Sequence, residues 1–520
     1  MKVEAKKIIW LLAIWQFFSI FMLAVGNWPS YVVWVNLVLL LVAMVFLTVF
    51  DSILLLIISI PFYLALPNQR FDSLSMWRIL FAFLLIVFLF KSDFLKGKKT
   101  RDILKQFLIF PWDKYILTFA CLAFLVIALF APFKLEGLKQ LLFFINIYLF
   151  YFVLAHTIKT RAEIIKVIRY TVGSLAIIIT IGFAQLFLTF FINMDIFWVY
   201  WASNFTKLYY GSRMMSVSLY SNSWFAFNGG RELRMFSIMP DSQSFAYLSV
   251  FAVGWGLALT LATSKKFRTW LWSGIRFAAL AIILSGTRAV WVGVFLPFFA
   301  TIGFYFKKLF ASQVRRVFWI FAIILILFAA SPLINKGLQM ARFGLFKESF
   351  IERFQSIYDL NETSNQGRIW IWEKSLMFAA AHPQGIGLSN FVYIFNPNDL
   401  PPDYNQLANN LNERYNLPQK YITAHNLYLQ VLIELGILGL IILAGFLIVF
   451  FKTIWKFLKQ HLKEDNVLSF FVFQSGLILL WLMAAALFDV TFFNDKVLMY
   501  CSLTLALTGI IIKNLENLKE

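Results

Sequence analysis

The chain has 520 residues, of which 61% are hydrophobic and 14% charged, and its formal net charge at pH 7 is +20. Soluble globular domains carry about a quarter charged residues, so this composition excludes a soluble enzyme and predicts an integral membrane protein. Most Lys and Arg residues lie in short loops between apolar runs, as in cytoplasmic loops of membrane proteins, so the charge does not point to nucleic-acid binding.

Apolar runs long enough to cross a hydrocarbon core of about 30 Å as helices recur along the whole sequence. We therefore predict an all-α fold, a polytopic transmembrane helical bundle of about twelve to fourteen spans with one large extracytoplasmic loop. The expected spans are Ile8–Val25, Tyr31–Phe50, Ser52–Leu66, Trp77–Phe90, Tyr115–Ala131, Leu138–Ala155, Val172–Phe191, Ser244–Ala262, Trp270–Leu284, Ala289–Phe304, Val317–Ala330, Asn426–Phe451, Val467–Phe488 and Val497–Ile512.

The basic loops predict the orientation of the bundle, because loops rich in Lys and Arg stay on the cytoplasmic side. Alternating the spans from a cytoplasmic N-terminus places every strongly basic loop inside, and both termini then face the cytoplasm. These loops are Lys91–Lys105, Lys159–Arg169, Lys265–Arg268, Lys307–Arg316 and Lys452–Lys463.

The spans and loops divide the chain into four expected parts. Residues 1–192 form an N-terminal transmembrane bundle, and residues 193–330 form a central transmembrane region with an outer loop at 193–243. Residues 331–424 form the large extracytoplasmic loop, and residues 425–520 form the C-terminal transmembrane helices. A loop of this length in a compact protein is usually functional or forms a small domain. Within it, Gly367–Ala381 has apolar residues at helical spacing and ends at a His-Pro turn.

A histidine and an asparagine, His425 and Asn426, open the apolar run after the large loop, and Gly436 and Gly439 follow. On a regular helix both glycines lie on the side of His425, where we expect them to let another helix pack close beneath the histidine. The helix N-terminus favours an anion and disfavours a charged imidazole. A neutral histidine beside a bound anion is a candidate proton acceptor. The alternative is that this segment only caps and packs a helix.

Three arginines, Arg234, Arg288 and Arg368, are predicted on the outer face, against the trend for positive residues. Arg288 follows a Ser-Gly-Thr break at the end of a membrane span, which is costly unless the break lines a cavity. The guanidinium group suits bidentate binding of phosphate. These arginines are therefore candidate phosphate ligands, and the alternative is that they only contact lipid headgroups.

The remaining ionisable residues give weaker indications. Glu434 lies within a membrane helix, where a carboxylate is either functional or paired with a neighbouring helix. Cys121 and Cys501 lie in apolar runs and have no metal-ligand spacing. We therefore expect no metal site and no cofactor.

Four segments, in this order along the chain, resemble the O-antigen ligase family, which includes the related O-antigen polymerases. They extend from Arg234 to about Leu443, and the segment Asn396–Lys420 is longer than is usual in that family. The segments are RMFSIMPDSQSFAYL (Arg234–Leu248), SGTRAVWVG (Ser285–Gly293), GRIWIWEKSLMFAAAHPQGIGLSNF (Gly367–Phe391), and His425-Asn426 followed by Gly436-x-x-Gly439.

The resemblance implies a GT-C-like membrane glycosyltransferase that moves a glycan from undecaprenyl pyrophosphate to an acceptor hydroxyl, with inversion and without a metal ion. Arg288 and Arg368, with Arg234, would bind the pyrophosphate, and His425 would activate the acceptor. The supporting residues would be Asn426, Gly436 and Gly439.

The same resemblance implies the location and the partners. The protein would lie in the cytoplasmic (inner) membrane, with its active site facing the periplasm or exterior. It would bind the lipid-linked glycan donor, a lipid or saccharide acceptor and membrane lipid, but no nucleic acid. One alternative is a polymerase that joins repeat units with the same chemistry. Another is a transporter of lipid-linked glycans, although the internal repeats of many transporters are not evident in this sequence.

Overall fold

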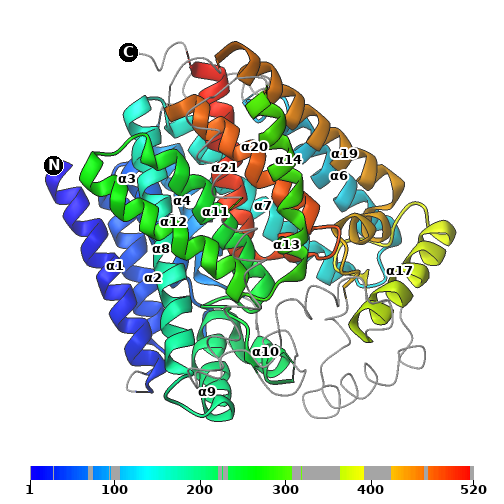
Figure 1. Cartoon of the computed structure of the whole chain (residues 1–520), viewed down its shortest axis with the longest axis horizontal. Helices are drawn as coiled ribbons and strands as arrows, with labels where there is room; N and C mark the ends of the chain where they lie inside the picture. The colour runs from blue at the N-terminus through cyan, green and yellow to red at the C-terminus, as the bar shows by residue number, and fades with distance from the viewer. Residues whose placement is uncertain are drawn as a thin grey trace.

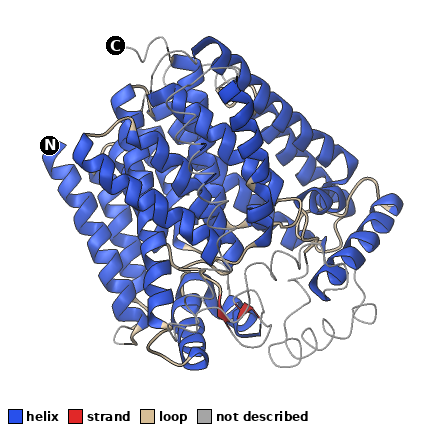
Figure 2. Cartoon of the chain, viewed as in Figure 1, coloured by secondary structure: helices blue, strands red, loops and turns tan. Residues whose placement is uncertain are grey.

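The computed structural model describes residues 2–26, 29–67, 74–92, 94, 106–220, 225–226, 232–306, 318, 322, 363–391, 423–461 and 467–515. These residues are almost entirely helical (Figure 1, Figure 2). The elements of the first part of the chain are α1 (Lys2–Ala24), α2 (Val32–Phe46), α3 (Val49–Ser59), the 3-10 turn η1 (Ile60–Phe62), α4 (Met76–Lys91), α6 (Asp113–Phe130), α7 (Lys134–Thr157) and α8 (Arg161–Leu188).

The remaining elements are α9 (Met194–Trp201), the π-helical turn η2 (Ala202–Thr206), α10 (Lys207–Tyr220), β1 (Phe225–Ala226), β2 (Glu232–Leu233), α11 (Ser242–Thr260), α12 (Lys265–Leu284), α13 (Arg288–Gly293), α14 (Phe295–Phe306), α17 (Thr363–Ala381), α19 (Leu427–His461), α20 (Val467–Ala485), the 3-10 turn η6 (Thr491–Phe493) and α21 (Asp495–Asn514). The two strands pair antiparallel, with Phe225 opposite Leu233.

The predicted all-α transmembrane bundle is confirmed. Nine of the described helices are long and apolar enough to cross a membrane, and three shorter apolar helices accompany them. Each predicted span overlaps a described helix except Val317–Ala330, which lies outside the described residues apart from positions 318 and 322. The predicted span Ala289–Phe304 consists of two helices, α13 and α14. Gly367–Ala381 is also helical, within α17.

The bundle has a buried centre and a rim of exposed apolar side chains. About 89% of the apolar windows of α11 and α20 and 78% of that of α21 are buried, compared with 22% of that of α6. One apolar cluster extends from Ile9 to Leu515. Peripheral helices expose large apolar side chains such as Leu11 and Phe46. Such exposure suits a lipid surrounding, because lipid tails are as apolar as these side chains.

The two ends of the bundle differ in composition. The start of α1 and the end of α21 lie at one end, whereas α9, α10 and α17 lie at the opposite end (Figure 1). At the first of these ends, Lys91, Lys159 and Lys513 line one pocket of about 960 Å³. In the predicted orientation, which stays a prediction, these lysines are cytoplasmic and α17 is extracytoplasmic.

The two predicted outer loops are described only in part. The loop at 193–243 contains α9, η2, α10 and the strand pair. Of the loop at 331–424, the described residues are 363–391 and 423–424, which include α17 and the turn that follows it. The segment Asn396–Lys420 lies outside the described residues.

Candidate functional site

The break between α12 and α13 projects Arg288 at the extracytoplasmic end that the topology predicts. Gly286 has φ +62°, and a β-carbon there would lie 3.2 Å from the Nε atom of Arg234. The Arg234 guanidinium donates to the carbonyl oxygens of Ser285 (3.2 Å) and Gly286 (3.1 Å). These carbonyls follow the last turn of α12 and lack helical partners, so a cation is a favourable cap. Arg288 then begins α13 as its first residue.

The helix α17 presents the second arginine. Its packed side consists of Gly367, Ile371, Ser375 and Ala379, which recur every four residues and are all buried. This periodicity is that of a helix packed along one face. Arg368 follows the first of these residues, so it lies beside the packed face and is half-buried. The sequence period therefore turns Arg368 toward the edge of the bundle rather than toward bulk solvent.

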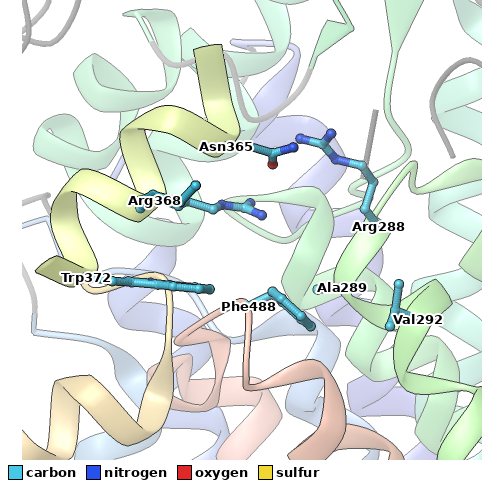
Figure 3. A pocket seen from close by; sticks show the side chains of 8 residues that line it. Arg288, Ala289, Val292, Asn365, Arg368, Trp372 and Phe488 are labelled. Atoms are coloured by element: carbon cyan, nitrogen blue, oxygen red, sulfur yellow. The ribbon is translucent and has the colours of Figure 1, made fainter. Parts of the chain in front are cut away.

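Arg288 and Arg368 line one pocket (Figure 3). Their guanidinium groups point into it from opposite sides, with the side chain of Asn365 beside them and the rings of Trp372 and Phe488 below. The pocket has a volume of about 150 Å³ and is also lined by Ala289, Val292 and Ile369. Pockets for drug-sized ligands measure about 300–1,000 Å³, so this one suits a group the size of a phosphate.

His425 lies just before α19 in an unusual backbone conformation. Its φ is +46°, a left-handed value that is rare for a residue other than glycine. The cap of α19 is Asn426, whose side-chain oxygen accepts from the N–H groups of Tyr428 (2.9 Å) and Leu429 (3.1 Å). His425 is therefore not needed as a cap. Its Nδ1 atom is buried and has no hydrogen-bond partner among the described residues.

The surroundings of His425 favour the neutral imidazole. Burial and the positive charge of Arg368 lower the pKa of His425 to about 4, and burial is the larger cause. At pH 7 the ring is therefore uncharged and has a nitrogen lone pair that can accept a proton.

Trp372 connects the pocket to His425. It lines the pocket, and its indole nitrogen donates a hydrogen bond of 2.9 Å to the carbonyl oxygen of Ala424. Ala424 is fully buried and directly precedes His425. On the other side, the N–H group of Leu427 donates to the carbonyl oxygen of Ala486 at the end of α20 (2.9 Å). The structure thus brings His425, Arg288 and Arg368 to one region of the molecule.

The segment that packs against Gly436 is the turn after α17 and not another helix. The predicted packing of a helix beneath His425 is therefore wrong. Gly436 has φ +70° and bends α19. A β-carbon there would lie 2.5 Å from the carbonyl carbon of Gln384. The N–H group of Ile437 donates to the carbonyl oxygen of Pro383 (3.0 Å), which belongs to the turn after α17. At Gly439, a β-carbon would meet the side chains of α19 itself.

A comparison with family models bears on this region. Residues 274–444 match the family model described as O-antigen ligase. This segment is similar to the O-antigen ligase family over about a third of the chain. It extends from within α12 to within α19 and contains Arg288, Arg368, His425 and both glycines, whereas Arg234 precedes it. No curated protein matches the chain.

The family match and the helices together indicate a broad class of protein. Its apolar helices and the O-antigen ligase domain make it a multi-pass membrane protein. The family points to glycan transfer in O-antigen biosynthesis, an activity of the ligase or glycosyltransferase type. In general terms, the family implies a lipid-linked glycan donor and a saccharide acceptor.

Some residues of this region were not predicted from the sequence, and one predicted residue lies elsewhere. Arg234 is not among the residues that line the pocket, and it binds the backbone that precedes Arg288 instead. Asn365 and Trp372 were missed, although they lie three residues before and four after Arg368, where helical spacing places side chains together. Phe488 follows the end of α20 and has no comparable sequence signal.

A buried carboxylate beside the pocket was also missed. Asp489 follows Phe488 and accepts hydrogen bonds from the hydroxyl of Thr491 and the N–H group of Val490, both at 2.6 Å. Burial is the main cause that raises its pKa to about 6, and the charge of Arg368 opposes the rise. A lone carboxylate at the end of an apolar run was the available signal. Among the described residues, no group of three or more His, Cys, Asp or Glu residues lies close enough to hold a metal ion.

Proposed function

We propose that the protein transfers a glycan from an undecaprenyl-pyrophosphate donor to an acceptor hydroxyl at the outer face of the cytoplasmic membrane. The observation that carries this proposal is the pocket shared by Arg288 and Arg368, close to a histidine with a lowered pKa. Two cations and a neutral base suit a reaction in which a diphosphate leaves while a hydroxyl loses its proton. The O-antigen ligase domain supports the same chemistry.

In this proposal the arginines bind the pyrophosphate of the donor. Each guanidinium presents N–H groups in a planar fork that matches two phosphate oxygens. The pocket of about 150 Å³ accommodates the phosphate region, so the glycan and the polyprenyl chain extend beyond it. Negative charge on the diphosphate increases as its bond to the sugar breaks. Preorganised cations at that position stabilise the transition state more than the ground state.

His425 is the general base of the proposed reaction. One of its ring nitrogens takes the proton of the acceptor hydroxyl while the hydroxyl oxygen forms a bond to the anomeric carbon. The bond from that carbon to the phosphate oxygen breaks, and undecaprenyl pyrophosphate leaves with the electron pair. A single displacement inverts the anomeric carbon. The imidazolium then releases its proton to solvent, and the reaction requires no metal ion in this scheme.

The test uses the purified full-length protein in lipid nanodiscs, a synthetic undecaprenyl-pyrophosphate glycan and a chelator. We expect transfer by the wild type. His425→Ala should bind the donor normally and turn over at least about a hundredfold more slowly, as expected for loss of a general base. His461→Ala, at the other end of α19, is the matched control and should keep wild-type activity. Full activity of His425→Ala would contradict the catalytic role.

The choice of acceptor in this assay separates related functions. Transfer to a lipid A core acceptor identifies a ligase, whereas growth of the glycan on a second donor molecule identifies a polymerase. Movement of the donor across the bilayer of sealed vesicles, without any transfer product, would overturn the proposal in favour of a transporter.

A further inference from the structure

Two polar side chains are buried in the outer half of α19, at the end that carries His425. Gln430 is 5% exposed and Glu434 is 4% exposed. A carboxylate in a membrane helix is costly unless it is satisfied by partners. The side-chain amide nitrogen of Gln430 donates a hydrogen bond of 2.7 Å to Glu434. The carboxylate also accepts from the backbone N–H groups of Ser389 and Phe391.

The hydrogen bond to Glu434 determines which way the amide of Gln430 points. A carboxylate only accepts hydrogen bonds, so it must face the NH₂ group of the amide. The amide oxygen then faces the opposite way and accepts from the N–H group of Ala424 over 2.9 Å. A chain of hydrogen bonds therefore runs from the turn after α17, through Glu434 and Gln430, to the residue before His425.

Ala424 is held on both sides of its peptide unit. Gln430 binds its N–H group, and Trp372 binds its carbonyl oxygen. The next residue, His425, has a φ of +46°. A left-handed conformation in a residue other than glycine costs energy and persists only where the surrounding structure enforces it. The contacts to Ala424 supply that constraint.

We propose that Gln430 and Glu434 are positioning residues that hold His425 in its reactive orientation beside the pocket lined by Arg288 and Arg368, the arginine pocket. Neither side chain is placed to touch the donor, because the hydrogen bonds described above occupy both of them inside the protein. They act through Ala424. The proposal rests on the proposed function for its kinetic consequences, but the orientation of His425 is testable without any enzymatic assay.

Three variants and one control test the hydrogen-bond chain through Glu434, Gln430 and Ala424 in the full-length protein. Gln430→Leu removes both of its hydrogen bonds, and Gln430→Glu places two carboxylates side by side. The double variant Gln430→Glu/Glu434→Gln reverses the central donor and acceptor. In it, the carboxylate at position 430 accepts from Ala424 and from the new amide at position 434, whose oxygen accepts from Ser389 and Phe391. Gln474→Leu is the control, because Gln474 is buried in α20 and its amide nitrogen has no hydrogen-bond partner among the described residues.

The kinetic arm measures glycan transfer. We expect kcat to fall about tenfold to a hundredfold in Gln430→Leu and Gln430→Glu, with KM for the donor unchanged, since one hydrogen-bond chain is lost and the arginines remain. The double variant should recover kcat to within about threefold of the wild type. A double variant no better than Gln430→Glu would overturn the proposal, as would a wild-type kcat in Gln430→Leu.

The second arm measures modification of His425 by diethyl pyrocarbonate, followed by mass spectrometry. His156 and His461, at the other end of the bundle, serve as internal references. Releasing Ala424 should increase the rate at His425 about tenfold in Gln430→Leu and restore the wild-type rate in the double variant. Equal rates of His425 modification in all variants would contradict the positioning role. If the wild type transfers no glycan but these rates change as stated, the proposed function fails and the positioning inference stands.

Discussion

The indole nitrogen of Trp372 donates a hydrogen bond of 2.9 Å to the carbonyl oxygen of Ala424, so a wall of the arginine pocket is joined to the residue before His425. The two partners belong to separate parts of the chain, α17 and the start of α19. This contact couples the position of Arg368, four residues before Trp372, to that of the histidine.

The first prediction concerns that contact. Trp372→Phe keeps a ring in the pocket but removes the N–H donor, so we expect kcat to fall about fivefold, equivalent to about 1 kcal/mol for one hydrogen bond. KM for the donor should change by less than twofold. Trp455→Phe, near the opposite end of α19, is the control. A reduced donor affinity with an unchanged kcat would show that the ring, not its N–H group, matters.

The second prediction separates charge from geometry in the pocket. Arg288→Ala and Arg368→Ala should each weaken donor binding about tenfold to a hundredfold, because each removes hydrogen bonds to a charged group. Arg288→Lys and Arg368→Lys should recover only part of this loss, since an ammonium group does not bind two phosphate oxygens as a planar fork does. Titration with a fluorescent donor analogue measures the effect. Complete recovery by lysine would leave charge as the sole requirement.

The third prediction is a pH dependence. Transfer requires the neutral imidazole of His425, whose pKa is lowered to about 4, so kcat should stay constant from pH 8 to about pH 5 and fall only below that range. Arg368→Gln removes a positive charge that contributes to the lowered pKa. The fall of kcat on the acid side of the pH profile, the acid limb, should therefore move upward, toward pH 6.5. Arg368→Lys keeps the charge and should leave the limb in place. An acid limb already near pH 6.5 in the wild type would contradict this assignment.

The same histidine also affects stability. Because the pKa of His425 is lower in the folded protein than in the unfolded chain, the unfolded chain binds the proton first as the pH falls. The stability contributed by the neutral ring is therefore complete above about pH 6.5 and is lost progressively toward pH 4.

The fourth prediction concerns Asp489, whose effect on folding stability changes with pH in the opposite direction to that of His425. Its pKa is raised from 3.8 to about 6, so the unfolded chain releases the proton first, and folding stability falls as the pH rises through this window. The cost above pH 6 is about 3 kcal/mol. Asp489→Asn should therefore raise the thermal unfolding midpoint at pH 8 and change it less at pH 4. A midpoint that falls equally at both pH values would mean that the hydrogen bonds of the carboxylate outweigh its burial.

The fifth prediction uses two glycines in apolar helices. Gly436→Ala introduces a β-carbon at φ +70° against the backbone of Gln384, so we expect a loss of at least about 1–3 kcal/mol and of most transfer activity. Gly274→Ala is the matched control: a β-carbon there meets nothing within 4 Å, and alanine favours the helix by about 0.5–1 kcal/mol. Unfolding midpoints in detergent and transfer rates measure both effects. Equal behaviour of the two variants would contradict the role of the bend.

Most of the fold follows from the sequence because membrane spans are defined by length and hydropathy alone. Each expected span overlaps at least one described helix wherever the structure describes most of that span. Pairing of Arg288 with Arg368 also agrees with sequence reasoning, since both are arginines predicted on the same side of the membrane. Topology thus brings together residues that are distant in the chain, and the signs of the loop charges predict the side of the membrane on which they lie.

The failures of sequence reasoning share one physical cause. Placing Gly436 and Gly439 beneath His425 assumed a straight helix, but α19 bends at Gly436 and His425 lies outside the helix with a left-handed backbone. Arg234 resembled the other outer arginines, yet its partners are backbone carbonyls of the break before α13. Backbone geometry of this kind is set by tertiary packing, which local residue patterns do not encode.

The interlocked backbones of α19 and the turn after α17 have an evolutionary consequence. Main-chain hydrogen bonds join the two segments. The N–H groups of Ile386 and Gly387 donate to the carbonyl oxygens of Ile433 and Glu434. In the other direction, the N–H group of Ile437 donates to the carbonyl oxygen of Pro383. Such a joint constrains the shape of the chain and requires glycine at Gly385 and Gly436, where φ is positive and a β-carbon would meet the backbone of the other segment. A β-carbon at either glycine would force the main chain of both segments to move, so the two segments can change only together.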